Sequence, residues 1–95
     1  MKVIGTKKTY VEVNADTDTA GRQHPLHIVW RDGRKLPVRV RSVTPAASLK
    51  AGGAGIRYTV DISGRQTYLF QEDTGDDAPL SRFRWFVEEK IWAED

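Results

Sequence analysis

The chain contains no cysteine among its 95 residues. This absence excludes disulfide bonds, thiolate metal sites and thiol nucleophiles, and it favours a reducing compartment, with the cytoplasm as the simplest expectation. Long apolar runs are also lacking. No stretch approaches the roughly 18 residues that a membrane-spanning helix needs, and Met1 to Tyr10 has no apolar core of signal-peptide length. We therefore expect neither membrane insertion nor secretion.

Length and composition predict one small folded domain. Hydrophobic residues make up 39% of the chain and charged residues 29%, a balance typical of soluble globular proteins rather than of disordered ones. A chain of this length has room for one hydrophobic core. We expect a single β-rich domain over residues 1–95, with an ordered core at about residues 8–89. The tail at residues 90–95 is expected to fray or to form one amphipathic turn.

Apolar and polar residues alternate with a period of two along most of the chain, which predicts strands with one face in a core. The expected strands cover residues 10–15, 26–31, 36–41, 55–62, 65–71 and 82–88. In the second of these, Leu26, Ile28 and Trp30 are expected to point inward. Pro37 cannot donate a hydrogen bond to a ladder, so the strand at 36–41 is expected at an edge or a bulge.

Glycine, proline and charged residues indicate the turns and loops between these strands. Asp32-Gly33 predicts a two-residue type I′ turn with positive φ at both positions, and Ser63-Gly64 predicts a second tight turn. The segments 16–24 and 43–55 are expected to be loops, the latter with at most one short helical turn at 45–51. Residues 72–81 are expected to form a solvated acidic loop.

Six strands without a long helix predict an all-β fold. The chain is too short for two stacked sheets. We therefore expect a small antiparallel six-stranded meander that coils into a half-open or closed barrel, which buries one face and shortens the exposed edges.

Charge is unevenly distributed, although the formal net charge is only +2. Residues 31–65 contain eight basic and two acidic residues, a net charge of +6, whereas residues 66–95 contain three basic and eight acidic residues, a net charge of −5. Small barrels bind single-stranded nucleic acid through cationic strand faces and stacking rings. The candidate nucleic-acid site consists of Arg39, Arg41, Lys50, Arg57, Tyr58 and Tyr68. In the alternative interpretation, these arginines pair with Glu12, Asp61 or the acidic loop and serve only solubility.

No arrangement of residues for catalysis or cofactor binding is found. The Gly-rich segment Lys50 to Gly55 precedes a strand rather than a helix, so we interpret it as a turn or bulge, with a weak anion contact as the alternative. His24 and His27 are expected on opposite faces of an extended segment without a third ligand. Asp76-Asp77 and Glu88-Glu89 are interpreted as solvated charge. We expect no enzymatic activity, no metal and no cofactor.

Four segments have distinctive sequences: YVEV at 10–13, PLHIVWRDGR at 25–34, AASLKAGGAGIRY at 46–58 and RWFVE at 84–88. Together they resemble a family of short bacterial proteins of unknown function from Firmicutes and their relatives. The resemblance implies a compact β-rich cytoplasmic domain and supplies no catalytic residues. The acidic segment at 73–77 is longer than the resemblance would lead us to expect.

Two functions remain open for a non-enzymatic binding module. The first is binding of single-stranded nucleic acid by the cationic block. The second is a protein interaction, favoured by the edge-like strand at 36–41, the charge asymmetry and the aromatic tail with Trp92. The opposite charges of the two halves also allow head-to-tail self-association, so the oligomeric state is left open.

Overall fold

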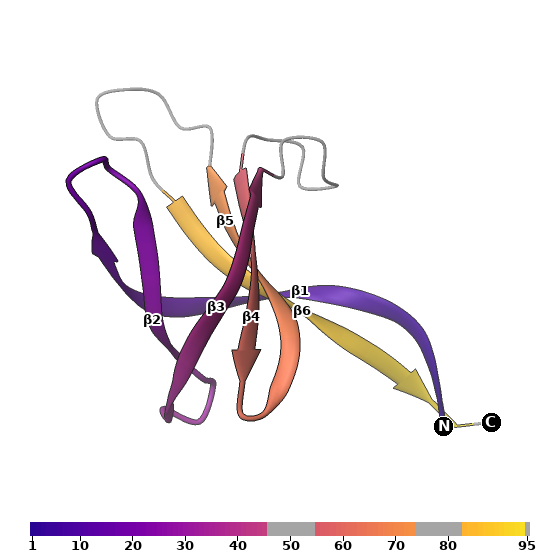
Figure 1. Ribbon diagram of the computed structural model, residues 1–95. Coiled ribbons are helices and arrows are strands. Elements are labelled where there is room, and N and C mark those ends of the chain that lie inside the picture. The colour runs from indigo at the N-terminus through magenta and orange to yellow at the C-terminus, as the bar shows by residue number, and fades with distance from the viewer. Residues whose placement is uncertain (46–54, 74–82, 95) are drawn as a thin grey trace.

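The computed structural model describes residues 1–45, 55–73 and 83–94 (Figure 1). It contains six strands: β1 (Lys2–Thr17), β2 (Gln23–Val29), β3 (Lys35–Pro45), β4 (Gly55–Ile62), β5 (Arg65–Asp73) and β6 (Phe83–Ala93). Each strand pairs antiparallel with the next, and β1 also pairs with β6, which closes the barrel. The predicted all-β six-stranded meander is thus confirmed. The helical turn predicted at 45–51 falls almost wholly on residues outside the described part.

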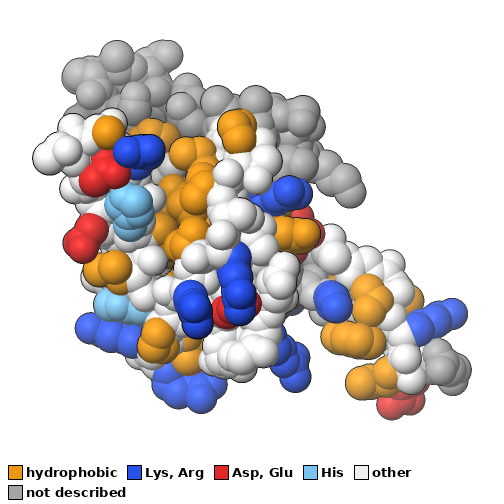
Figure 2. Space-filling model, viewed as in Figure 1, with side chains coloured by type: hydrophobic (Ala, Val, Ile, Leu, Met, Phe, Trp, Pro, Cys, Tyr) orange, Lys and Arg blue, Asp and Glu red, His pale blue; other side chains and the backbone are white. Residues whose placement is uncertain are grey.

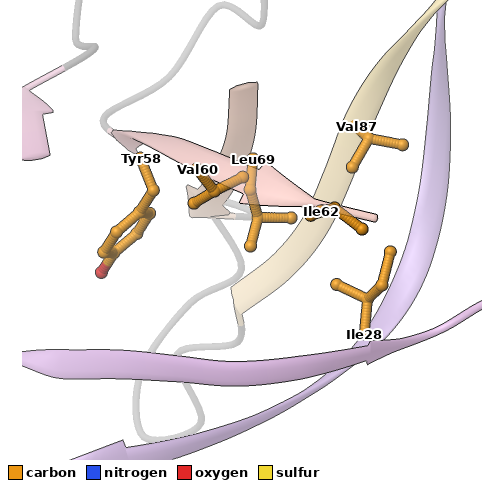
Figure 3. Packing of buried hydrophobic residues seen from close by; sticks show 6 residues of the cluster. All are labelled: Ile28, Tyr58, Val60, Ile62, Leu69 and Val87. Atoms are coloured by element: carbon orange, nitrogen blue, oxygen red, sulfur yellow. The ribbon is translucent and has the colours of Figure 1, made fainter. Parts of the chain in front are cut away.

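The core lies inside the barrel and is built mainly by alternate residues of β4. Tyr58, Val60 and Ile62 point inward, and Val60 and Leu69 of β5 are completely buried. Figure 3 shows this cluster, which also contains Ile28 and Val87. Among the described residues no helix is long and apolar enough to span a lipid bilayer.

Several strands are longer than predicted. Residues 16–17 and 23–24 belong to β1 and β2, and residues 43–45 belong to β3, so the loop prediction is wrong for these residues. The first and last strands gain the most. Lys2 lies opposite Ala93 and Thr6 opposite Lys90, so residues 2–8 and 88–93 form a two-stranded terminal arm that extends away from the barrel (Figure 1). The prediction of a frayed or turned tail is therefore wrong for residues 90–93. Alternation failed to indicate this arm because its apolar side chains lie in solvent: Ile4 is 60% exposed and Trp92 is 54% exposed.

A bulge in β2 overturns the prediction that Leu26 points inward. Asn14 and Ala15 of β1 lie opposite His27 and Pro25, so Leu26 has no ladder partner. One extra residue in a strand shifts every preceding side chain to the other face. Pro25 is therefore buried, whereas Leu26 is 47% exposed. The bulge also places His24 and His27, opposite Asp16 and Asn14, on one face, so the prediction of opposite faces is wrong.

The two predicted tight turns differ in type. Ser63 and Gly64 both have positive φ, 52° and 77°, as a two-residue type I′ turn requires. At Asp32-Gly33 only Gly33 has a positive φ, and its backbone N–H donates to the Trp30 carbonyl at 2.8 Å. This is a three-residue loop built on a type I turn, so the type I′ prediction is wrong at this position.

Gly55 begins β4 at a point where no side chain fits. A Cβ atom on this residue would lie 2.7 Å from the backbone carbonyl oxygen of Gln71. Close approach to the neighbouring strand thus explains one glycine of the Gly-rich segment. The weak anion contact considered for residues 50–54 concerns residues outside the described part.

Candidate nucleic-acid interface

Tyr58 lies in the core and cannot serve as a stacking platform. Its side chain is 2% exposed, packs against Trp85 with ring centroids 5.4 Å apart, and donates a hydrogen bond to the Gln23 carbonyl at 3.1 Å. Burial raises the pKa of this phenol. The prediction of Tyr58 as a stacking residue is wrong. Successive side chains of β4 point to opposite faces, so Arg57 points outward and Tyr58 points inward.

The predicted ridge of basic residues on β3 is partly neutralised. Arg41 Nε donates to Asp61 Oδ2 at 2.6 Å, which is the internal pairing that the alternative interpretation foresaw. Arg39 lies opposite Asp61 in the ladder but is exposed, and no described side chain forms an ion pair with it. Lys50 lies outside the described residues.

Arg57 and Tyr68, by contrast, are brought together. The Arg57 guanidinium lies over the Tyr68 ring at 4.6 Å from its centroid, and Tyr68 remains 41% exposed. A stacked guanidinium presents a cation beside an aromatic face. Within the described part of the chain, the buried Nε of Arg57 has no hydrogen-bond acceptor.

Tyr68 is one end of a continuous line of four rings, here called the ring line: Tyr68, Phe70, Phe86 and Tyr10. Consecutive ring centroids are 6.3, 4.7 and 5.6 Å apart, and the central phenylalanine pair is stacked at an interplanar angle of 9°. The line crosses β5, β6 and β1 on the outer side of the barrel. Its two phenylalanines are buried, and its terminal tyrosines are exposed.

Strand register explains how the ring line forms. Phe70 lies opposite Phe86, and Phe86 lies opposite Tyr10, so the three rings occupy one row across three strands. Directly opposite residues in antiparallel strands are close enough for ring contact. The aromatic residues on both faces of β6 indicated that this strand is covered on both sides. The register that places Phe86 opposite Tyr10 is not encoded in a local pattern, so Tyr10 was not predicted as a site residue.

Glu72 holds the Tyr10 end of the ring line in place. Its side chain is 6% exposed, and it accepts hydrogen bonds from Tyr10 Oη at 3.0 Å, Arg84 Nη2 at 2.8 Å and Lys8 Nζ at 3.1 Å. Burial raises the pKa of this carboxyl group, but the three donors outweigh burial and lower it below its usual value. Glu72 was expected in a solvated loop, and this prediction is wrong because the residue belongs to β5.

Cations flank both ends of the ring line. Arg84 lies over the Tyr10 ring at 4.6 Å from its centroid, and Lys8 Nζ lies 4.9 Å from the centroid of Phe86. With Arg57, three cations surround the line, and in the part of the chain that the structure describes Glu72 is the one carboxylate hydrogen-bonded to any of them. The face therefore combines exposed rings with cationic side chains, a combination suited to bases and phosphates.

A second site missed by the sequence analysis is the turn between β1 and β2. Asp18 Oδ1 accepts hydrogen bonds from the backbone N–H groups of Ala20 and Arg22, both at 2.9 Å, and Oδ2 lies 2.9 Å from His24 Nε2. The contact with His24, followed by the backbone N–H groups, lowers the pKa of Asp18 to about 2. No group of three side chains suited to hold a metal ion occurs among the described residues.

Comparison with known proteins adds no relative to this description. No family model, no curated protein and no solved structure matches the chain. The side chains of the ring line and the cations around it are therefore the features that point to a function.

Proposed function

We propose that this protein is a non-enzymatic binding module that holds single-stranded nucleic acid against the ring line. The observation that supports the proposal is the pair of exposed tyrosines, Tyr68 and Tyr10, each with an arginine stacked on it. Unpaired bases stack on aromatic side chains without requiring a particular sequence, and cations beside the rings contact the backbone.

The guanidinium groups of Arg57 and Arg84 also support this proposal, because each lies over an exposed tyrosine of the ring line. A phosphate oxygen is an acceptor that matches a guanidinium well. In this scheme Arg57 and Arg84 contact phosphates, and Tyr68 and Tyr10 stack on bases.

Direct binding tests this function. A fluorescently labelled single strand of mixed sequence is titrated with the protein, and anisotropy is recorded at low salt and near physiological salt. Affinity is expected to fall as salt rises, because phosphate contacts release counterions.

The variant Tyr68→Leu separates stacking from charge. It is expected to weaken binding by about 5- to 150-fold, the equivalent of one lost stacked base, whereas the control Tyr68→Phe keeps the ring and should bind as the parent does. Absence of binding at low salt, or equal affinities for Tyr68→Leu and Tyr68→Phe, would contradict the proposal.

A protein interaction is the second candidate function. The observation that favours it is the edge of β3 at residues 38–45, which no described strand pairs with on the β2 side.

A further inference from the structure

β2 and β3 pair only close to the turn that joins them. Their ladder contains three pairs, which end at His27 opposite Pro37. β3 then continues to Pro45, paired with β4 alone. In the described chain, the edge of β3 that faces β2 therefore has no strand beside residues 38–45. An unpaired edge offers a row of backbone donors and acceptors to an added strand.

A hollow of about 650 Å³ opens beside this edge. It extends from the β1–β2 turn and the start of β2 to β3, and its floor includes Ile56 and Tyr58 of β4. Figure 2 shows hydrophobic side chains gathered in the middle of this face, with basic, acidic and histidine side chains around them. The hollow is thus apolar inside and mainly polar at its rim.

Two valines of β3 show that this part of the barrel interior lacks a cover. Val40 lies opposite the core residue Val60, and Val43 lies opposite Tyr58, so both point inward. They are nevertheless 37% and 56% exposed, whereas Val60 is completely buried. A strand added to the free edge would place its own inward side chains next to both valines and remove apolar surface from water.

The outward face of the same edge is cationic. Arg39 is exposed without an ion-pair partner among the described residues. Arg41 forms an ion pair with Asp61. Outward side chains of an added strand would lie beside these arginines. Opposite charges on neighbouring strands stabilise pairing, and like charges oppose it.

From these observations we infer that the free edge of β3 binds an extended peptide that alternates apolar and acidic residues. The peptide adds as a seventh strand along residues 38–45, about 27 Å of edge. Its apolar side chains enter the hollow over Val40 and Val43, and its acidic side chains face Arg39 and Arg41. This site is separate from the ring line and does not depend on nucleic-acid binding.

A second copy of the chain is a poorer occupant of this edge. Two β3 strands paired about a twofold axis would bring Arg39 and Arg41 of one copy toward the same residues of the other. Basic residues on an edge strand are a recognised protection against such self-pairing. The charge that discourages a second copy is the charge that selects an acidic peptide.

The test uses three blocked peptides of eight residues. The first peptide alternates valine and glutamate. The second has lysine in place of glutamate. The third has the sequence of the first, but N-methyl groups replace the N–H donors along one edge of the peptide strand. Amide chemical shifts of the labelled protein are followed at low salt. The glutamate peptide is expected to shift amides of residues 38–45 and to bind about fivefold or more tightly than the lysine peptide. The peptide methylated on its pairing edge is expected not to bind.

Variants that change the charge at Arg39 test whether this residue selects the acidic peptide. Arg39→Glu is expected to reverse the preference between the two peptides, and Arg39→Gln, which adds no charge beside Asp61, is expected to reduce the preference without reversing it. Equal binding of both peptides, absence of binding up to millimolar peptide, or shifts confined to the ring line would overturn the inference. A concentration-dependent dimer with protected β3 amides would overturn it in favour of a second copy.

Discussion

The Tyr10 hydroxyl donates a hydrogen bond to Glu72 at 3.0 Å across β6, the strand that lies between them in the barrel. Tyr10 comes from β1 and Glu72 from β5, so the bond joins the first strand of the chain to a strand that is not its neighbour. Because Lys8 and Arg84 donate to the same carboxylate, one buried acid organises the Tyr10 end of the ring line.

Removing the charge of Glu72 should destabilise the protein. Glu72→Gln leaves one acceptor oxygen in place of two and leaves Lys8 and Arg84 without their carboxylate. We expect a loss of about 1–3 kcal/mol in the free energy of unfolding, measured by urea denaturation. The matched control is Glu88→Gln on the exposed side of β6, which should change stability by no more than about 0.5 kcal/mol. Equal effects of the two substitutions would disprove the organising role of Glu72.

Acid should weaken the turn at Asp18. The folded-state pKa is lowered from 3.8 to about 2, so the carboxylate favours the folded state above the unfolded pKa, and this contribution is lost as pH falls toward 2. In Asp18→Asn, the part of the stability loss between pH 4 and 2 that comes from Asp18 should be absent. Carboxyl ¹³C shifts report the titration directly, and an Asp18 pKa near 3.8 in the folded protein would refute the expectation.

Two glycine substitutions with opposite expected signs test the packing at the start of β4. Gly55→Ala should destabilise the protein by about 1–3 kcal/mol, because its Cβ would meet the Gln71 carbonyl oxygen at 2.7 Å. Gly5→Ala in the terminal arm meets no atom closer than 3.9 Å and should be neutral or stabilising by up to about 1 kcal/mol. Thermal unfolding measures the stability of both variants. A Gly55→Ala variant as stable as the parent protein would contradict the close approach of the strands.

Backbone amides of the terminal arm should exchange with solvent faster than those of β4. Residues 2–8 and 88–93 pair only with one another, and an isolated two-stranded ribbon is marginally stable in water. β4 pairs on both sides and carries the core, so its amides should open only with global unfolding. Hydrogen exchange followed by NMR measures both regions. Equal protection of Thr6 and Val60 would show that the arm is held by contacts beyond its own pairing.

Much of the fold could be predicted because β4 and its turn are locally determined. Strict alternation gave the bounds Gly55–Ile62 and the inward set of this strand, and Ser63-Gly64 gave its turn. The outward position of Leu26 was not predictable in this way, because a bulge depends on the pairing with β1. Alternation gives the face on which each residue lies, but it does not give the register between strands.

The candidate site was only partly predictable for the same reason. Arg57 and Tyr68 lie on neighbouring strands joined by a tight turn, and both were candidate site residues from the sequence. Tyr10 meets Glu72 and Phe86 through register between segments more than sixty residues apart in the chain. The two halves of the ring line therefore meet only in the folded barrel.

Mapping the nucleic-acid contact on the folded protein tests the central claim most directly. Amide and aromatic chemical shifts of the labelled protein are recorded during titration with a short mixed-sequence single strand, at low salt and near physiological salt. The account predicts shifts clustered on Arg57, Tyr68, Tyr10 and Arg84 that weaken as salt rises. A flat response at both salts, or shifts confined to residues 38–45 at the edge of β3, would contradict it.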